Sequence, residues 1–84
     1  MPSKEERLNS ARQICDDLYA RGGINKWWML DSVAKRLGMP FDDALEEAKV
    51  AAASEWLELR SFSVVLSEKG RREAAQRARK KGGR

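Results

Sequence analysis

The 84-residue chain has no histidine and only one cysteine, Cys15, and these shortages exclude several kinds of site. A disulfide within the chain is impossible, and a zinc site built from Cys and His lacks its ligands. Without a histidine, Cys15 also lacks the usual base that activates a cysteine nucleophile. We therefore predict no metal, no cofactor and no enzymatic activity. The scarcity of cysteine fits a reducing compartment, so we expect a cytoplasmic protein.

Long apolar runs are missing as well. No stretch approaches the roughly 18 apolar residues that cross a bilayer, and the N-terminal residues lack the apolar core of a secretory signal. We expect no association with a membrane through a spanning segment. The 42% of apolar residues nevertheless suffices for one hydrophobic core, and the length corresponds to one domain.

The charge is unevenly distributed along the chain. Residues 1–68 contain 9 Lys/Arg and 12 Asp/Glu, a net charge of −3, whereas residues 69–84 contain 8 Lys/Arg and one Glu, a net charge of +7. The formal charge of +4 therefore comes from the C-terminal segment alone. Such a segment attracts polyanions such as nucleic acid or an acidic membrane surface.

The first helix is predicted over residues 4–21. Ser3 and Glu6 have the spacing of a capping box, in which each side chain satisfies a backbone N–H of the first turn. Gly22 and Gly23 end the helix, because glycine adopts the left-handed cap at little cost. The apolar residues recur at helical spacing: Leu8, Ala11, Ile14, Cys15, Leu18 and Tyr19.

Two shorter helices follow. The second is predicted over residues 32–37, with Asp31 or Ser32 as its N-cap and residues 38–40 as its stop. The third begins near Phe41 or Asp42 and ends around Ser54. Its apolar face is rich in alanine, which permits close packing with little side-chain volume, and consists of Phe41, Ala44, Leu45, Ala48, Ala51 and Ala52.

An antiparallel hairpin is predicted after the third helix, because Leu57 and Leu59 alternate with charged residues and a second alternating run follows them. The turn over residues 60–63 lacks an Asn-Gly signal, so we expect a short wing. Part of residues 24–30 is predicted to pair with this hairpin. Neighbouring strand residues point to opposite faces, so we expect one ring of Trp27 and Trp28 in the core and the other partly exposed. We interpret the pair mainly as core residues, and stacking of an exposed ring on a base or a partner protein is the alternative.

Ser67 is predicted to cap a fourth, basic helix. Beyond about Gln76 only Ala78 is apolar, so we expect the C-terminal end to fray or to be disordered.

Three segments, residues 30–38, 55–59 and 65–71, together resemble the winged helix-turn-helix family of DNA-binding transcription regulators. They match its second helix and turn, the passage from its third helix into the first wing strand, and its second wing strand with the cap and glycine that follow. The resemblance implies an α+β fold of three helices, a short antiparallel β-hairpin wing and a basic C-terminal helix or tail. The winged-helix domain would cover residues 1–72, and a partly disordered basic extension would cover residues 73–84.

In this family the third helix enters the major groove and the wing lies along the backbone or the minor groove. The resemblance therefore implies binding to double-stranded DNA. By position, Lys35 and Arg36 would contact the backbone, Lys49 would lie on the third helix and Arg60 at the wing. With the basic segment included, the candidate DNA-binding residues are Lys35, Arg36, Lys49, Arg60, Lys69, Arg71, Arg72, Arg77, Arg79, Lys80 and Lys81.

The third predicted helix departs from this pattern. Its first two turns carry Asp42, Asp43, Glu46 and Glu47, with Lys49 as the nearby base. Duplex DNA carries one negative charge per about 1.7 Å of axis, so four carboxylates facing it would be repelled. We interpret Asp42 and Asp43 as caps that offset the helix dipole, and the two glutamates as an ordinary solvated face.

Two hypotheses follow. In the first, the protein binds DNA through the wing and the basic tail with limited base readout, as extended basic segments do. In the second, the winged helix is an interaction module whose acidic third helix docks on a basic protein partner. The tail would also permit association with RNA or the ribosome. We expect a monomer or a weak homodimer, with the first helix as the better dimer surface, because the fourth offers only three alanines.

Overall fold

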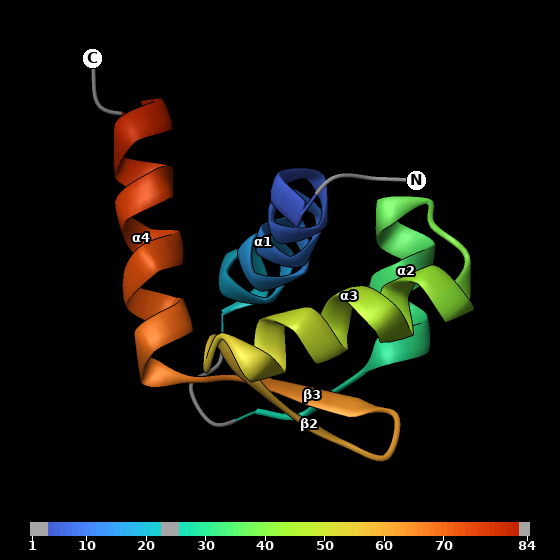
Figure 1. Ribbon diagram of the computed structural model, residues 1–84. Helices are drawn as coiled ribbons and strands as arrows, with labels where there is room; N and C mark the ends of the chain where they lie inside the picture. The colour runs from blue at the N-terminus through green and yellow to red at the C-terminus, as the bar shows by residue number, and fades with distance from the viewer. Residues whose placement is uncertain (1–3, 23–25, 83–84) are drawn as a thin grey trace.

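The computed structural model describes residues 4–22 and 26–82, with the side chains of residues 8–22 and 26–80 (Figure 1). The fold is α+β, as predicted. The described residues form four helices and three strands, whereas the resemblance implied three helices, a two-stranded wing and a basic helix or tail. In chain order these are α1 (Lys4–Arg21), β1 (Trp28–Met29), α2 (Leu30–Leu37), α3 (Phe41–Ala53), β2 (Leu57–Arg60), β3 (Ser63–Leu66) and α4 (Glu68–Gly82).

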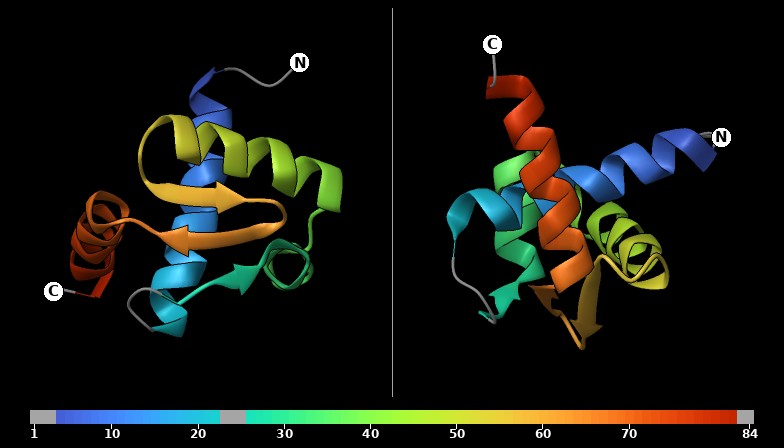
Figure 2. Two further views of the ribbon diagram at one scale, coloured as in Figure 1. Left: turned by 90° about the horizontal axis from the view of Figure 1, so that it is seen from below. Right: turned by 90° about the vertical axis from the view of Figure 1, so that its left-hand side faces the viewer.

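α1 is the element against which the other three helices pack (Figure 2). Its predicted bounds are confirmed, while the predicted capping box at Ser3 lies outside the described residues. Ile14 and Leu18 of α1 are buried against Leu30 of α2, Val64 of β3 and the alanines of α3. The apolar stripe that made the first helix a candidate dimer surface is therefore largely covered within the chain.

The three strands form one antiparallel sheet in the order β1-β3-β2. Trp28 pairs with Val64, and Leu57 pairs with Leu66, which confirms both the hairpin and the short strand predicted within residues 24–30. Trp28 is partly buried against the core, whereas Trp27 is 41% exposed. The predicted division of the two rings between core and solvent is thus confirmed.

The predicted side-chain caps of α2 and α3 are wrong. α2 begins at Leu30 rather than Ser32, and its N-cap, Met29, makes no side-chain capping bond. The buried Leu30 donates its N–H to the carbonyl of Phe62 at 2.8 Å, so the sheet fixes the start of the helix. Pro40 is likewise the N-cap of α3 without a side-chain bond. Asp31, Asp42 and Asp43 lie inside the first turns, where their charges still favour the helix dipole.

The prediction that the chain frays beyond about Gln76 is also wrong, because α4 continues through Gly82. Ala74 is buried where α4 packs against α1, and Arg77 forms an ion pair with Asp16 of α1. Helices in proteins owe most of their stability to such tertiary contacts rather than to propensity. The polar composition of the tail does not reveal them.

The first turn of α4 lies directly against the segment before β2. Ser67 caps the helix as predicted: its Oγ accepts a hydrogen bond from the N–H of Gly70 at 3.0 Å and donates one to the carbonyl of Glu55 at 2.6 Å. A Cβ on Gly70 would lie 1.9 Å from the carbonyl oxygen of Trp56. Gly70 therefore sets how closely α4 approaches the rest of the fold.

Gly70→Ala is expected to lower the free energy of unfolding by about 2–3 kcal/mol, because the obstructing oxygen belongs to the backbone and cannot rotate away. Gly38→Ala is the matched control. Gly38 has a φ of 69°, but nothing lies within 4 Å of an added Cβ there. Backbone strain alone should cost about 1 kcal/mol at that position. Urea unfolding measures both variants, and a Gly70→Ala protein as stable as the wild type would contradict the close approach.

Candidate functional site

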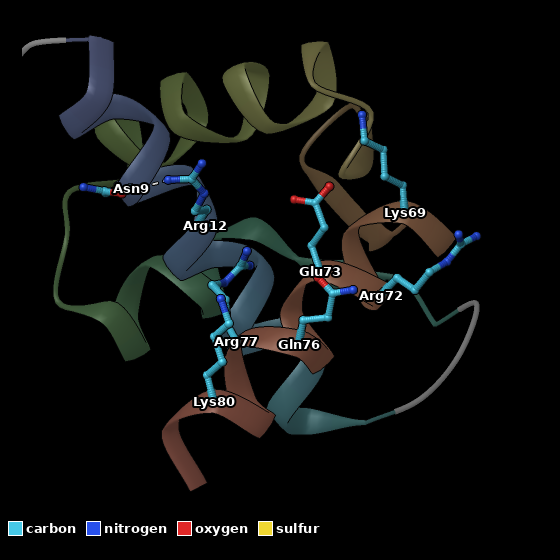
Figure 3. A pocket seen from close by; sticks show the side chains of 8 residues that line it. All are labelled: Asn9, Arg12, Lys69, Arg72, Glu73, Gln76, Arg77 and Lys80. Atoms are coloured by element: carbon cyan, nitrogen blue, oxygen red, sulfur yellow. Dashed lines mark hydrogen bonds between the residues drawn. The ribbon is translucent and has the colours of Figure 1, made fainter. Parts of the chain in front are cut away.

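A groove of about 670 Å³ runs between α1 and α4, and it gathers positive charge (Figure 3). Five of the eight lining side chains are cationic and one is a carboxylate, which leaves an excess of four positive charges. The lining residues are Asn9, Arg12, Lys69, Arg72, Glu73, Gln76, Arg77 and Lys80.

The groove follows from the spacing of polar residues on the two helices. Positions 69, 72, 76 and 80 lie three or four residues apart, so their side chains share one face of α4. Positions 9 and 12 do the same on α1. Between the helices, the small buried residues Cys15 and Ala74 allow the backbones to approach, and the longer polar chains stand at the rims.

Arg12 is held in place from two sides. Its Nη1 donates a hydrogen bond to Oδ1 of Asn9 at 3.0 Å, and its guanidinium lies 5.3 Å from the ring centroid of Trp56. A guanidinium over a tryptophan ring gains a cation–π attraction and keeps its outer edge available to donate further hydrogen bonds. Arg12 is therefore oriented before any ligand arrives.

Arg77 also lines the groove, but it is held in an ion pair with Asp16 of α1. Its Nε and Nη2 donate to Oδ1 of Asp16 at 3.0 and 2.8 Å, and Nε also donates to Oδ2 at 3.3 Å. This pair joins the second half of α4 to α1, and it neutralises Arg77. Arg72 also has a carboxylate partner, Glu68, at 3.3 Å on the same helix, but this pair is exposed to solvent and therefore weak. The cations that can act on a ligand are thus Arg12, Lys69, Lys80 and, once a phosphate replaces the Glu68 carboxylate, Arg72.

The other predicted site residues do not join this groove. Lys35 pairs with Asp31 on α2 at 3.4 Å, and Lys49 lies 3.9 Å from Glu46 on α3. Arg36 donates through Nε to Asp17 at 3.1 Å and links α2 to α1.

Three further predicted cations lie elsewhere. Arg60 lies over the ring of Trp27 at the end of β2, next to the hairpin turn, which points away from α4 (Figures 1 and 2). Arg71 and Arg79 are exposed on α4 but do not line the groove. The side chain of Lys81 lies outside the described part of the chain.

Four lining residues were missed by the sequence-based candidates: Glu73 and Gln76 on α4, and Asn9 and Arg12 on α1. The last two come from a segment that the sequence did not connect with the basic tail. The available signal was their three-residue spacing beside the apolar stripe of the first helix, which places both on one face. Nothing in the sequence indicates that this face meets the fourth helix, because the two segments lie about sixty residues apart.

The exposed side of α3 is acidic. Asp42, Asp43 and Glu46 all face solvent, and Lys49 is the exposed cation among the described residues of this helix. The charge of α3 is therefore opposite to that of the groove, and the two surfaces would attract ligands of different sign.

Two kinds of chemistry receive no support. Burial raises the pKa of the Cys15 thiol from its ordinary value of 9.0 to about 12, so the thiol stays protonated and unreactive near neutral pH. Within the described ranges, no group of three or more His, Cys, Asp or Glu side chains could hold a metal ion.

None of the described helices is both long and apolar enough to span a bilayer.

Comparison with known proteins adds no relative: no family model, no curated protein and no solved structure matches this chain.

Asp16→Asn tests whether the ion pair with Arg77 holds α4 against α1. The pair is partly exposed, so we expect a loss of stability of only about 1 kcal/mol, with faster amide exchange in the second half of α4. Asp31→Asn is the matched control, because its pair with Lys35 is more exposed and should contribute less than about 0.5 kcal/mol. Unchanged exchange over residues 77–82 in Asp16→Asn would contradict this role.

Proposed function

We propose that this protein is a winged helix-turn-helix protein that binds double-stranded DNA through the groove between α1 and α4. The order of its elements supports the winged-helix assignment: three helices precede the hairpin, and a short strand after α1 completes the sheet. The binding surface differs from the one that the family resemblance implied, because the groove cations come from α1 and α4 instead of α3 and the wing.

The gathering of Arg12, Lys69, Arg72 and Lys80 around one groove is the observation that carries this proposal. Lys69 and Lys80 lie eleven residues apart on α4, which corresponds to about 16 Å of helix axis. One DNA strand carries about five phosphates over that length, at roughly 3.4 Å per phosphate along the duplex axis. A phosphate backbone therefore fits the groove in both charge and length.

This mode of binding favours the backbone over the bases. The acidic exposed face of α3 would be repelled by a duplex, so the helix that usually reads bases in this fold is unsuited to the major groove. Phosphate contacts fix the position of a protein on DNA but carry no sequence information. We therefore propose binding with little sequence preference, and no transcriptional target is implied.

The salt dependence of duplex affinity tests the proposal. Neutralisation of about four phosphates predicts that log affinity falls with a slope near −3.6 against log salt. Arg72→Gln/Lys80→Gln should reduce the slope to about −1.8 and weaken binding at least about tenfold at roughly 0.1 M salt. Fluorescence anisotropy of a labelled blunt duplex measures both quantities.

Arg71→Gln/Arg79→Gln is the matched control, because it removes the same charge from exposed positions of α4 outside the groove. The proposal predicts a clearly smaller loss than in the groove variant. Equal losses would show that the net charge of the helix, and not the groove, attracts DNA. Absence of any duplex binding in dilute salt would remove the proposed function.

A second candidate function is docking of a basic protein partner on α3, and the exposed carboxylates of Asp42, Asp43 and Glu46 favour it. Asp43→Asn/Glu46→Gln separates the two functions. Under the DNA proposal, this variant binds duplex as tightly as the wild type or slightly more tightly, because a repulsive charge is removed. If the wild type binds a polylysine peptide but no duplex, and this variant loses the peptide, the protein-docking function replaces DNA binding.

A further inference from the structure

Apart from Tyr19, the exposed large apolar side chains lie on the outer face of the sheet and at the hairpin turn. Trp27 is 41% exposed, Met29 is 62% exposed and Phe62 is 56% exposed. Figure 2 (left) looks onto this face, with α1 behind the strands and no described helix in front of them. Strand alternation explains the arrangement, because Trp28 packs toward the core while its neighbours on both sides point away from it.

The three side chains follow the edge of the sheet to the tip of the hairpin. Met29 pairs with Ser63, and the N–H of Leu30 donates to the carbonyl of Phe62 at 2.8 Å, so β1 ends beside the hairpin turn. The ring of Phe62 is supported by an edge-to-face contact with Phe41 at 5.5 Å between centroids. We call Trp27, Met29 and Phe62, together with Arg60, the aromatic edge.

Positive charge lies at this edge and on the other side of β1, around the inward-facing Trp28. The guanidinium of Arg60 lies 5.4 Å from the ring centroid of Trp27, and Nζ of Lys26 lies 4.5 Å from that of Trp28. Arg21 and Arg36 approach the same Trp28 ring, and both pair with the single carboxylate of Asp17. Glu58 is the exposed carboxylate on the described strands. Cations therefore outnumber carboxylates around the two tryptophans.

We infer that the aromatic edge binds unpaired bases of a single-stranded nucleic acid. Proteins that hold single strands combine aromatic rings, on which bases stack, with cations that follow the phosphates, and an arginine plane stacked on a ring enlarges the stacking surface. Paired bases inside a duplex are stacked on one another and do not reach such rings. A polyanion with aromatic faces matches the exposed rings of this edge and the cations beside it.

The inference rests on the proposed function for the class of ligand and makes it more specific. The hairpin turn points away from α4, and the longest dimension of the molecule is 36 Å. One DNA molecule with a duplex part and an unpaired part can therefore occupy the groove and the aromatic edge together. The protein is then suited to DNA at a junction between duplex and single strand.

Anisotropy with three probes tests this inference: a blunt duplex, the same duplex with an overhang of about twelve thymidines, and the single-stranded thymidine oligomer alone. The wild type should bind the overhang duplex about tenfold more tightly than the blunt duplex. Trp27→Ala should abolish this preference and leave the affinity for the blunt duplex unchanged. Trp27→Phe, which retains a ring, should keep most of the preference and guards against a simple folding defect.

Tyr19→Ala is the matched control, since Tyr19 is an exposed aromatic residue on α1 away from the sheet. It should keep the full preference for the overhang. Binding of the thymidine oligomer should also quench the tryptophan fluorescence of the wild type and quench that of Trp27→Phe much less.

Equal affinity of the wild type for the overhang and blunt duplexes would overturn the inference and leave the proposed function standing. Equal loss of preference in Trp27→Ala and Tyr19→Ala would also overturn it. Binding of the overhang duplex and the oligomer without binding of the blunt duplex would instead remove the proposed function while supporting the aromatic edge.

Discussion

The contact between Gly70 and the carbonyl of Trp56 is the constraint on which the rest of the structure depends. It lets the first turn of α4 lie against the segment before β2, and Ser67 caps the helix at that point. From there α4 crosses α1, where the pair of Arg77 and Asp16 joins the two helices. Without this docking, the basic C-terminal segment would have no fixed partner, and its cations would not meet Arg12 across a groove.

Much of the fold could be predicted because it depends on local patterns. The bounds of α1, the start of α3, the hairpin and the Ser67 cap all follow from apolar periodicity and from residues with strong local preferences. The start of α2 and the length of α4 could not be predicted, because tertiary contacts decide them. Leu30 is held by the carbonyl of Phe62, and α4 is held by Ala74 and Arg77 against α1.

Only part of the candidate site could be predicted, because tertiary contacts decide which side chains meet in the groove. Lys69, Arg72 and Lys80 stand out as cations in a basic segment, whereas Arg12 becomes recognisable only when α1 and α4 lie side by side. Arg36 and Arg77 were predicted from the sequence to contact phosphates, but in the structure both are held in ion pairs. Arg36 pairs with Asp17, and Arg77 pairs with Asp16. These two pairs join α2 and α4 to the same helix.

We propose that the groove between α1 and α4, and not the exposed face of α3, receives the nucleic acid. An NMR titration of the protein with a short duplex tests it most directly, because each backbone amide reports separately. We expect the largest chemical-shift changes at Asn9, Arg12 and the residues of α4 from Lys69 to Lys80, with small changes along α3. The largest changes at Asp42, Glu46 and Lys49 would contradict it.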